Sequence, residues 1–133
     1  MKHIVFPASL TELDAIIRFI SDYAQAAGVS GETITKCTLA AEEAFANIAN
    51  YAYAPGPGNV TVSINADKDF LIIRFTDQGR QYNPLSKEDP DISLTATDRE
   101  PGGLGIYMIK QLMDEVSYEY RDSQNILTLR KAI

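Results

Sequence analysis

A carboxylate and two amides lie along one face of an expected helix. Glu43, Asn47 and Asn50 stand at positions i, i+4 and i+7, and this spacing places their side chains in one row. An amide oxygen is a suitable ligand for Mg²⁺, and a carboxylate one turn away can orient or deprotonate a hydroxyl group. The row therefore suits phosphoryl transfer, whereas a pair of this kind taken alone is more often a solvated helix surface.

Two other segments carry residues that nucleotide sites use. Asp77 ends an expected strand and continues its core-facing row, which is costly for a carboxylate without a hydrogen-bonding partner or a ligand. The segment Gly103-Leu104-Gly105 opens an expected helix, where glycines allow a phosphate to approach closely and free N–H groups attract an anion. Together with Glu43 and Asn47, these residues predict a nucleotide site with a metal ion.

Hydrophobic periodicity predicts the helices that would position these residues. A capping box at residues 9–12 precedes an amphipathic pattern that ends at Gly28. A second helical pattern covers residues 30–52, up to a Pro- and Gly-rich turn, and a third covers residues 103–113. Residues 78–101 show no sustained periodicity, so we expect a long loop there.

The strands cluster in the sequence instead of alternating regularly with helices. They are expected at residues 3–6, 60–65, 70–76, 116–120 and 126–129. Adding the helices gives the order β-α-α-β-β-loop-α-β-β. This order favours an α+β fold, namely a two-layer sandwich in which helices cover one face of a mainly antiparallel, mixed sheet.

The composition is that of one globular domain spanning residues 1–133, with 45% hydrophobic and 23% charged residues. The formal net charge of -6 argues against direct nucleic-acid binding, which relies on basic side chains. No segment approaches the roughly 20 apolar residues of a membrane span, and no signal peptide is evident. We therefore expect a cytoplasmic protein. The lone Cys37 is expected to be a buried, inert thiol.

Three motifs in a fixed order carry a resemblance to a known family. They are Glu43-x-x-x-Asn47 on a helix, Asp77-x-Gly79-x-x-Tyr82-x-Pro84 after a strand, and Gly103-x-Gly105 at the start of a helix. The chain resembles the Bergerat-type ATP-binding domain shared by gyrase, histidine kinases and heat-shock chaperones. Within it, the chain is similar to the small anti-sigma-factor serine/threonine kinases that regulate bacterial transcription. The resemblance covers essentially the whole chain.

The resemblance implies a role for each motif residue. Asn47 would coordinate the Mg²⁺ that bridges the phosphates of ATP, and Glu43 would be the general base for a protein hydroxyl. Asn50, on the same row, is counted with the nucleotide-binding residues. Asp77 would accept a hydrogen bond from the amino group of adenine. The segment Gly103-Leu104-Gly105 would cradle the phosphates.

The same resemblance assigns the segment between the strand and the last helix. Gly79 would let the backbone approach the base, and Tyr82 with Pro84 would shape the wall beside adenine. Residues 85–101 would form a lid over the nucleotide. Arg99, within this lid, is a candidate contact of the γ-phosphate.

The chain departs from the family pattern at two positions. Relatives often carry His four residues after the metal-binding asparagine, where this chain has Tyr51. Relatives often carry Thr near adenine on the last pair of strands, and the matching position is assigned to Ile126. A hydroxyl contact to the nucleotide would then be missing.

In this family the kinase holds a sigma factor inactive and phosphorylates a small anti-anti-sigma partner of the STAS type on Ser or Thr. These partners, ATP and Mg²⁺ are therefore expected here, and a homodimer is suggested by the resemblance alone. A non-catalytic, ATP-gated binding module of the same fold is the main alternative. The catalytic half of a histidine kinase and a structural protein without a ligand rank below it.

Overall fold

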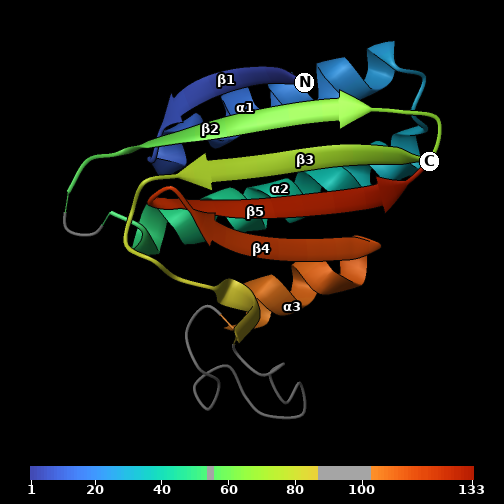
Figure 1. Ribbon diagram of the computed structural model, residues 1–133. Helices are drawn as coiled ribbons and strands as arrows, with labels where there is room; N and C mark the ends of the chain where they lie inside the picture. The colour runs from blue at the N-terminus through green and yellow to red at the C-terminus, as the bar shows by residue number, and fades with distance from the viewer. Residues whose placement is uncertain (54–55, 87–102) are drawn as a thin grey trace.

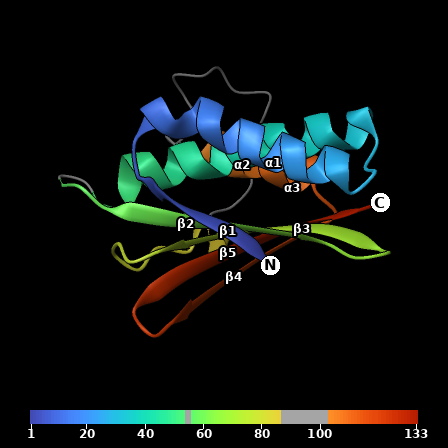
Figure 2. The ribbon, with the colours of Figure 1, turned by 90° about the horizontal axis from the view of Figure 1, so that it is seen from above.

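The helices cover one face of a five-stranded sheet (Figure 1), and Figure 2 shows the two layers from above. The computed structural model describes residues 1–53, 56–86 and 103–133, without the side chains of Gly103 and Leu104. The strands are β1 (Lys2–Pro7), β2 (Asn59–Ala66), β3 (Phe70–Asp77), β4 (Glu115–Arg121) and β5 (Gln124–Ala132). The helices are α1 (Leu13–Ala26), α2 (Gly31–Tyr51) and α3 (Gly103–Leu112), with 3-10 turns η1 (Leu10–Glu12) and η2 (Pro84–Ser86).

The sheet has the strand order β1-β2-β3-β5-β4, and its four pairings are all antiparallel. This confirms the α+β two-layer fold expected from the sequence. The mixed character expected for the sheet is absent from the described strands. The reason is that β3 and β4 run in the same direction, but β5 inserts between them and pairs antiparallel with both.

Alternation along the strands places one row of side chains against the helices. In β3, burial alternates residue by residue, and Ile73 and Phe75 are fully buried. Their cross-strand partners in β5 are Leu129 and Leu127. Apolar side chains opposite one another on the helix side form the sheet half of the core.

Helix α2 supplies the other half of the core. Phe45 is fully buried, and the small residues Ala40, Ala41 and Ala44 beside it let the helix lie close to the sheet. Ser30 caps its first turn by accepting a hydrogen bond from the Thr33 N–H at 3.3 Å. No helix among the described residues is long and apolar enough to cross a membrane.

The first helix begins differently from the expected capping box. Ser9 Oγ accepts a hydrogen bond from the Thr11 N–H at 3.4 Å, but Glu12 makes no side-chain capping bond. The first turn is the 3-10 segment η1, in which the spacing of free N–H groups differs from that of an α-helix. Only half of the box therefore forms.

Hydrogen bonds hold the end of α2 against the end of β3, and we call this set of bonds the clasp. The hydroxyl of Tyr53 accepts from the Gln78 N–H and donates to the Asn59 carbonyl, each at 2.7 Å. The Arg80 N–H donates to the Ala52 carbonyl at 3.1 Å. Because hydrogen bonds to the Tyr53 hydroxyl and the Ala52 carbonyl join the helix end to the strand end, the residues on the two ends keep a fixed relation.

Glycine is required at residue 79 by this clasp. A Cβ added there would lie 2.4 Å from the carbonyl oxygen of Ala52, a backbone atom that cannot swing away. Gly79→Ala is expected to lower the free energy of unfolding by about 1–3 kcal/mol in urea titrations. Gly31→Ala is the matched control, since no heavy atom lies within 4 Å of its added Cβ. Equal stability of the two variants would contradict the clasp.

The core of α2 gives a second stability test. Phe45→Ala removes a fully buried ring and leaves a cavity, so a loss of about 3–5 kcal/mol in the free energy of unfolding is expected. Leu39→Ala, on the same helix but 43% exposed, should change it by less than about 0.5 kcal/mol. A small effect of Phe45→Ala would show that the helix layer can be repacked without this ring.

Candidate functional site

A pocket opens where β3 ends and β5 begins, beside the C-terminal half of α2. It contains about 400 Å³ of empty space, part of it open to solvent. Its lining residues come from α2, from the β3 end and the segment after it, and from β4 and β5. They are Ala44, Asn47, Ile48, Tyr51, Ala52, Asp77, Arg80, Tyr82, Pro84, Tyr118, Asn125 and Leu127. Apolar walls with a few convergent polar groups are typical of small-molecule sites.

Asp77 is the buried acid of this pocket, only 4% exposed. Its Oδ1 accepts hydrogen bonds from the Gly79 N–H and from the Asn125 side-chain amide, both at 2.9 Å. Oδ2 accepts none from any residue that the structure describes. The two bonds offset the cost of burying a carboxylate and leave one oxygen for a ligand.

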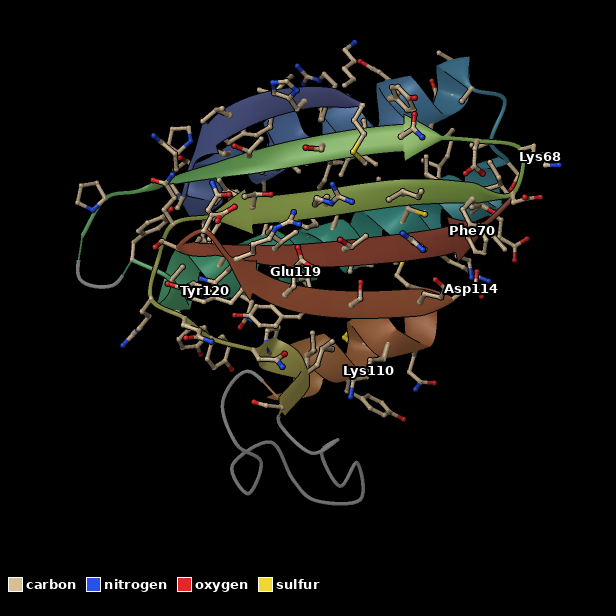
Figure 3. The ribbon with its side chains drawn as sticks, viewed as in Figure 1. Lys68, Phe70, Lys110, Asp114, Glu119 and Tyr120 are labelled. Carbon is tan, nitrogen blue, oxygen red and sulfur yellow. The ribbon has the colours of Figure 1, made fainter. Side chains whose placement is uncertain are left out.

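Asn125 was missed from the sequence, and Ile126 was wrongly placed at the site. Asn125 lies directly opposite Asp77 in the β3–β5 register, so both side chains face the helices. Ile126 pairs with Thr76 and with Glu119 on the open face of the sheet, and Figure 3 labels Glu119 there. A shift of one residue along a strand moves a side chain to the other face. The missing hydroxyl at Ile126 therefore has no bearing on this pocket.

The start of β5 also differs from the expectation. The expected strand covers residues 126–129, after a polar run at residues 122–125. In the structure only Asp122 and Ser123 form the turn, with φ of 55° and 60°. Two residues with positive φ make a tight hairpin turn, so β5 already begins at Gln124. Asn125 is a polar residue at the start of an apolar row, and this is the signal from which the sequence could have identified it as a site residue.

Asn47 lies on the pocket wall and is half-buried. Its side chain makes no hydrogen bond to any residue in the described ranges, so its amide oxygen is available to a ligand. The described residues contain no group of three or more His, Cys, Asp or Glu side chains that could hold a metal ion. The amide oxygen of Asn47 is of the donor type that suits Mg²⁺, which would take its other oxygens from phosphates and water.

Glu43 points toward the first turn of α3. A Cβ added at Gly105 would lie 3.0 Å from Glu43 Oε2, so the absence of a side chain at Gly105 makes room for the carboxylate. Gly103 is the first residue of α3, as expected. The structure thus brings together the acid of the first motif and Gly105 of the third.

Some of the remaining expected site residues line the pocket and others do not. Tyr82 and Pro84 line the pocket, whereas Asn50 is exposed and is not among the lining residues. Asn50 lies in the last turn of α2, between the lining residues Ile48 and Tyr51, but its exposed side chain is on another face of the helix. Arg99 and most of the expected lid lie outside the described residues, as does the side chain of Leu104. The roles of these residues stay predictions.

Two aromatic residues flank the pocket at the clasp. The rings of Tyr51 and Tyr82 lie with centroids 6.5 Å apart and planes inclined by 35°. Arg80, another lining residue missed from the sequence, donates from Nε to the Tyr51 carbonyl at 3.0 Å. The tyrosine that departs from the family pattern is therefore part of the pocket wall.

Tyr118 lines the pocket, and its hydroxyl is hydrogen-bonded there. It donates a hydrogen bond to Asn125 Oδ1 at 2.6 Å. Burial raises the pKa of Tyr118, and the nearby charge of Asp77 acts in the same direction. The phenol therefore keeps its proton.

Cys37 lies in the core, away from this pocket. Burial raises the pKa of its thiol to about 11, as expected for an inert core residue.

The chain is similar to known ATPase domains and protein kinases. Residues 6–131 match the family model of the histidine kinase-like ATPase domain. The chain is 32% identical over 93 residues to the serine/threonine-protein kinase BtrW of Bordetella bronchiseptica, covering 69% of this chain and 66% of the relative.

Two further relatives are named serine-protein kinases. The chain is 31% identical to the serine-protein kinase RsbW of Bacillus cereus (strain AH187), covering 87% of this chain and 76% of the relative. It is 29% identical to RsbW of Halalkalibacterium halodurans, covering 91% and 76%. With the family model matched over residues 6–131, this chain belongs to the histidine kinase-like ATPase domain family, among its RsbW-like members.

Proposed function

We propose that this chain is an ATP-dependent protein serine/threonine kinase that binds a sigma factor and phosphorylates a STAS-type anti-anti-sigma partner. One observation carries the proposal. A single end of the fold holds Asn47 and the buried Asp77 in one pocket, and Glu43 lies one helical turn from Asn47, against the first turn of α3. The residues proposed to recognise the base, to bind the metal ion and to act as general base therefore follow one another in space in the order Asp77, Asn47, Glu43.

The nucleotide would lie with its base against Asp77. The free Oδ2 would accept a hydrogen bond from the amino group of adenine, between the pocket walls that include Tyr82 and Leu127. The phosphates would then extend past Asn47 toward the first turn of α3. Backbone N–H groups at this helix start favour negative charge. When bound at Asn47, Mg²⁺ would neutralise charge on the phosphates and hold them in place.

Glu43 would act on the hydroxyl of the partner protein. The serine or threonine oxygen forms a bond to the γ-phosphorus while the bond from that phosphorus to the oxygen of ADP breaks. The proton of the hydroxyl passes to the Glu43 carboxylate. No hydrogen bond or ion pair to a described residue engages this carboxylate, so it is free to accept a proton.

The protein partners are inferred from the family. The relatives are named serine-protein kinases, which supports a hydroxyl-bearing protein as substrate. The net charge of -6 is compatible with a basic surface on a sigma factor. Such partners place the reaction in the cytoplasm, and a homodimer remains part of the proposal.

The test is transfer of labelled γ-phosphate from ATP, with Mg²⁺, to a candidate STAS-type protein. Glu43→Gln should lower the transfer rate by about 10²- to 10⁴-fold and leave ATP binding nearly unchanged, because only proton transfer is affected. Asn47→Ala should abolish the Mg²⁺-dependent part of ATP binding as well as transfer.

Glu42→Gln is the matched control, since it removes a half-buried carboxylate from the neighbouring position of α2. It should transfer phosphate at the wild-type rate. Transfer by Glu43→Gln at that rate would contradict the assigned base. ATP binding without transfer to any candidate would favour the ATP-gated binding module instead.

A further inference from the structure

Asn125 uses its whole hydrogen-bonding capacity at one point of the pocket. It is 6% exposed. Its Nδ2 donates to Asp77 Oδ1 and to the Arg80 carbonyl, both at 2.9 Å, and reaches the Gly79 carbonyl at 3.4 Å. Its Oδ1 accepts from the Tyr82 N–H at 3.2 Å and from the Tyr118 hydroxyl at 2.6 Å. A side-chain amide has two N–H donors and two lone pairs, so all are used.

The orientation of this amide is fixed by backbone groups. A carbonyl can only accept a hydrogen bond, and a backbone N–H can only donate one. The Arg80 carbonyl therefore requires Nδ2 on its side, and the Tyr82 N–H requires Oδ1 on the other. A flipped amide would oppose oxygen to oxygen and N–H to N–H.

This orientation determines what Asp77 can offer to a ligand. With Nδ2 of Asn125 and the Gly79 N–H both donating to Oδ1, that oxygen is an acceptor and cannot carry a proton toward them. The carboxyl group cannot rotate without losing both bonds. The ligand then meets Oδ2 as a fixed acceptor of hydrogen bonds.

We propose that Asn125 is a positioning residue that sets the base specificity of the pocket. By holding Asp77 Oδ1, it presents Oδ2 to a purine that carries an amino donor at position 6. A purine with an oxo group there would oppose acceptor to acceptor and be rejected. The inference rests on the proposed function, because it takes an adenine nucleotide to lie against Asp77.

The test compares the affinities of ATP and inosine triphosphate, measured by calorimetric titration with Mg²⁺ and without a protein substrate. The two nucleotides differ at the 6-amino and 6-oxo groups. The wild type should prefer ATP by at least about tenfold, since the oxo group leaves buried acceptors unpaired. Asn125→Leu, of similar shape without hydrogen bonds, should weaken ATP binding by about tenfold or more and bring the ratio near one.

The ratio separates positioning from a merely structural role. If Asn125→Leu weakens both nucleotides equally, or neither, the inference is overturned. Ile126→Thr, one residue along β5 but on the open face, is the control and should keep the wild-type ratio. A changed ratio in this control would also count against the assignment to Asn125.

A second variant applies if Asn125→Leu does not fold. Tyr118→Phe removes the phenol donor to Asn125 Oδ1, and it should lower the ATP preference as the Asn125 amide loosens. An unchanged ratio would overturn the inference. If the wild type binds neither nucleotide, the proposed function falls together with the inference. If it binds ATP and the variants keep the ratio, only the inference falls.

Discussion

The arrangement of this pocket depends on a carboxylate that is buried at the end of a core strand. Asp77 continues the apolar row of β3, where an unpaired charge would be strongly unfavourable. Its bonds from the Gly79 N–H and the Asn125 amide make the position tolerable. Through Asn125 the same bonds reach the segment after β3 and Tyr118 on β4. The hydrogen bonds that begin at this one acid therefore connect β3, β4, β5 and the segment after β3 around the pocket.

Helix α2 joins the core to the site. Its buried face, centred on Phe45, fixes the helix against the sheet, and the adjoining face carries Glu43 and Asn47. Its C-terminal end is clasped to the segment after β3 through Tyr53 and Ala52. The position of the candidate metal ligand relative to Asp77 is therefore set by core packing and by these hydrogen bonds. A rigid scaffold of this kind is what a site needs to hold reacting groups in place.

Most of the fold follows from local patterns in the sequence. The alternation in β2 and β3 and the helical period in α1 and α2 predict elements close to those observed, because burial of one face is a property of the backbone period. Motif spacing predicts much of the site. Asn47, Asp77, Tyr82 and Pro84 do line one pocket, and Glu43 and Gly105 do meet. Asn50 is exposed outside that pocket, and Arg99 lies outside the described residues.

The sequence by itself determined the types of element and the residues able to do chemistry, since both depend on composition and spacing within short segments. Only the tertiary structure decided that Asn125, and not Ile126, faces Asp77 across 48 residues of chain. The register of β5 depends on a two-residue turn and on pairing with a distant strand, and a slip of one residue reverses every face. Likewise, only the packing of α3 on α2 brings Gly105 to Glu43, because long-range contacts are not encoded in a local period.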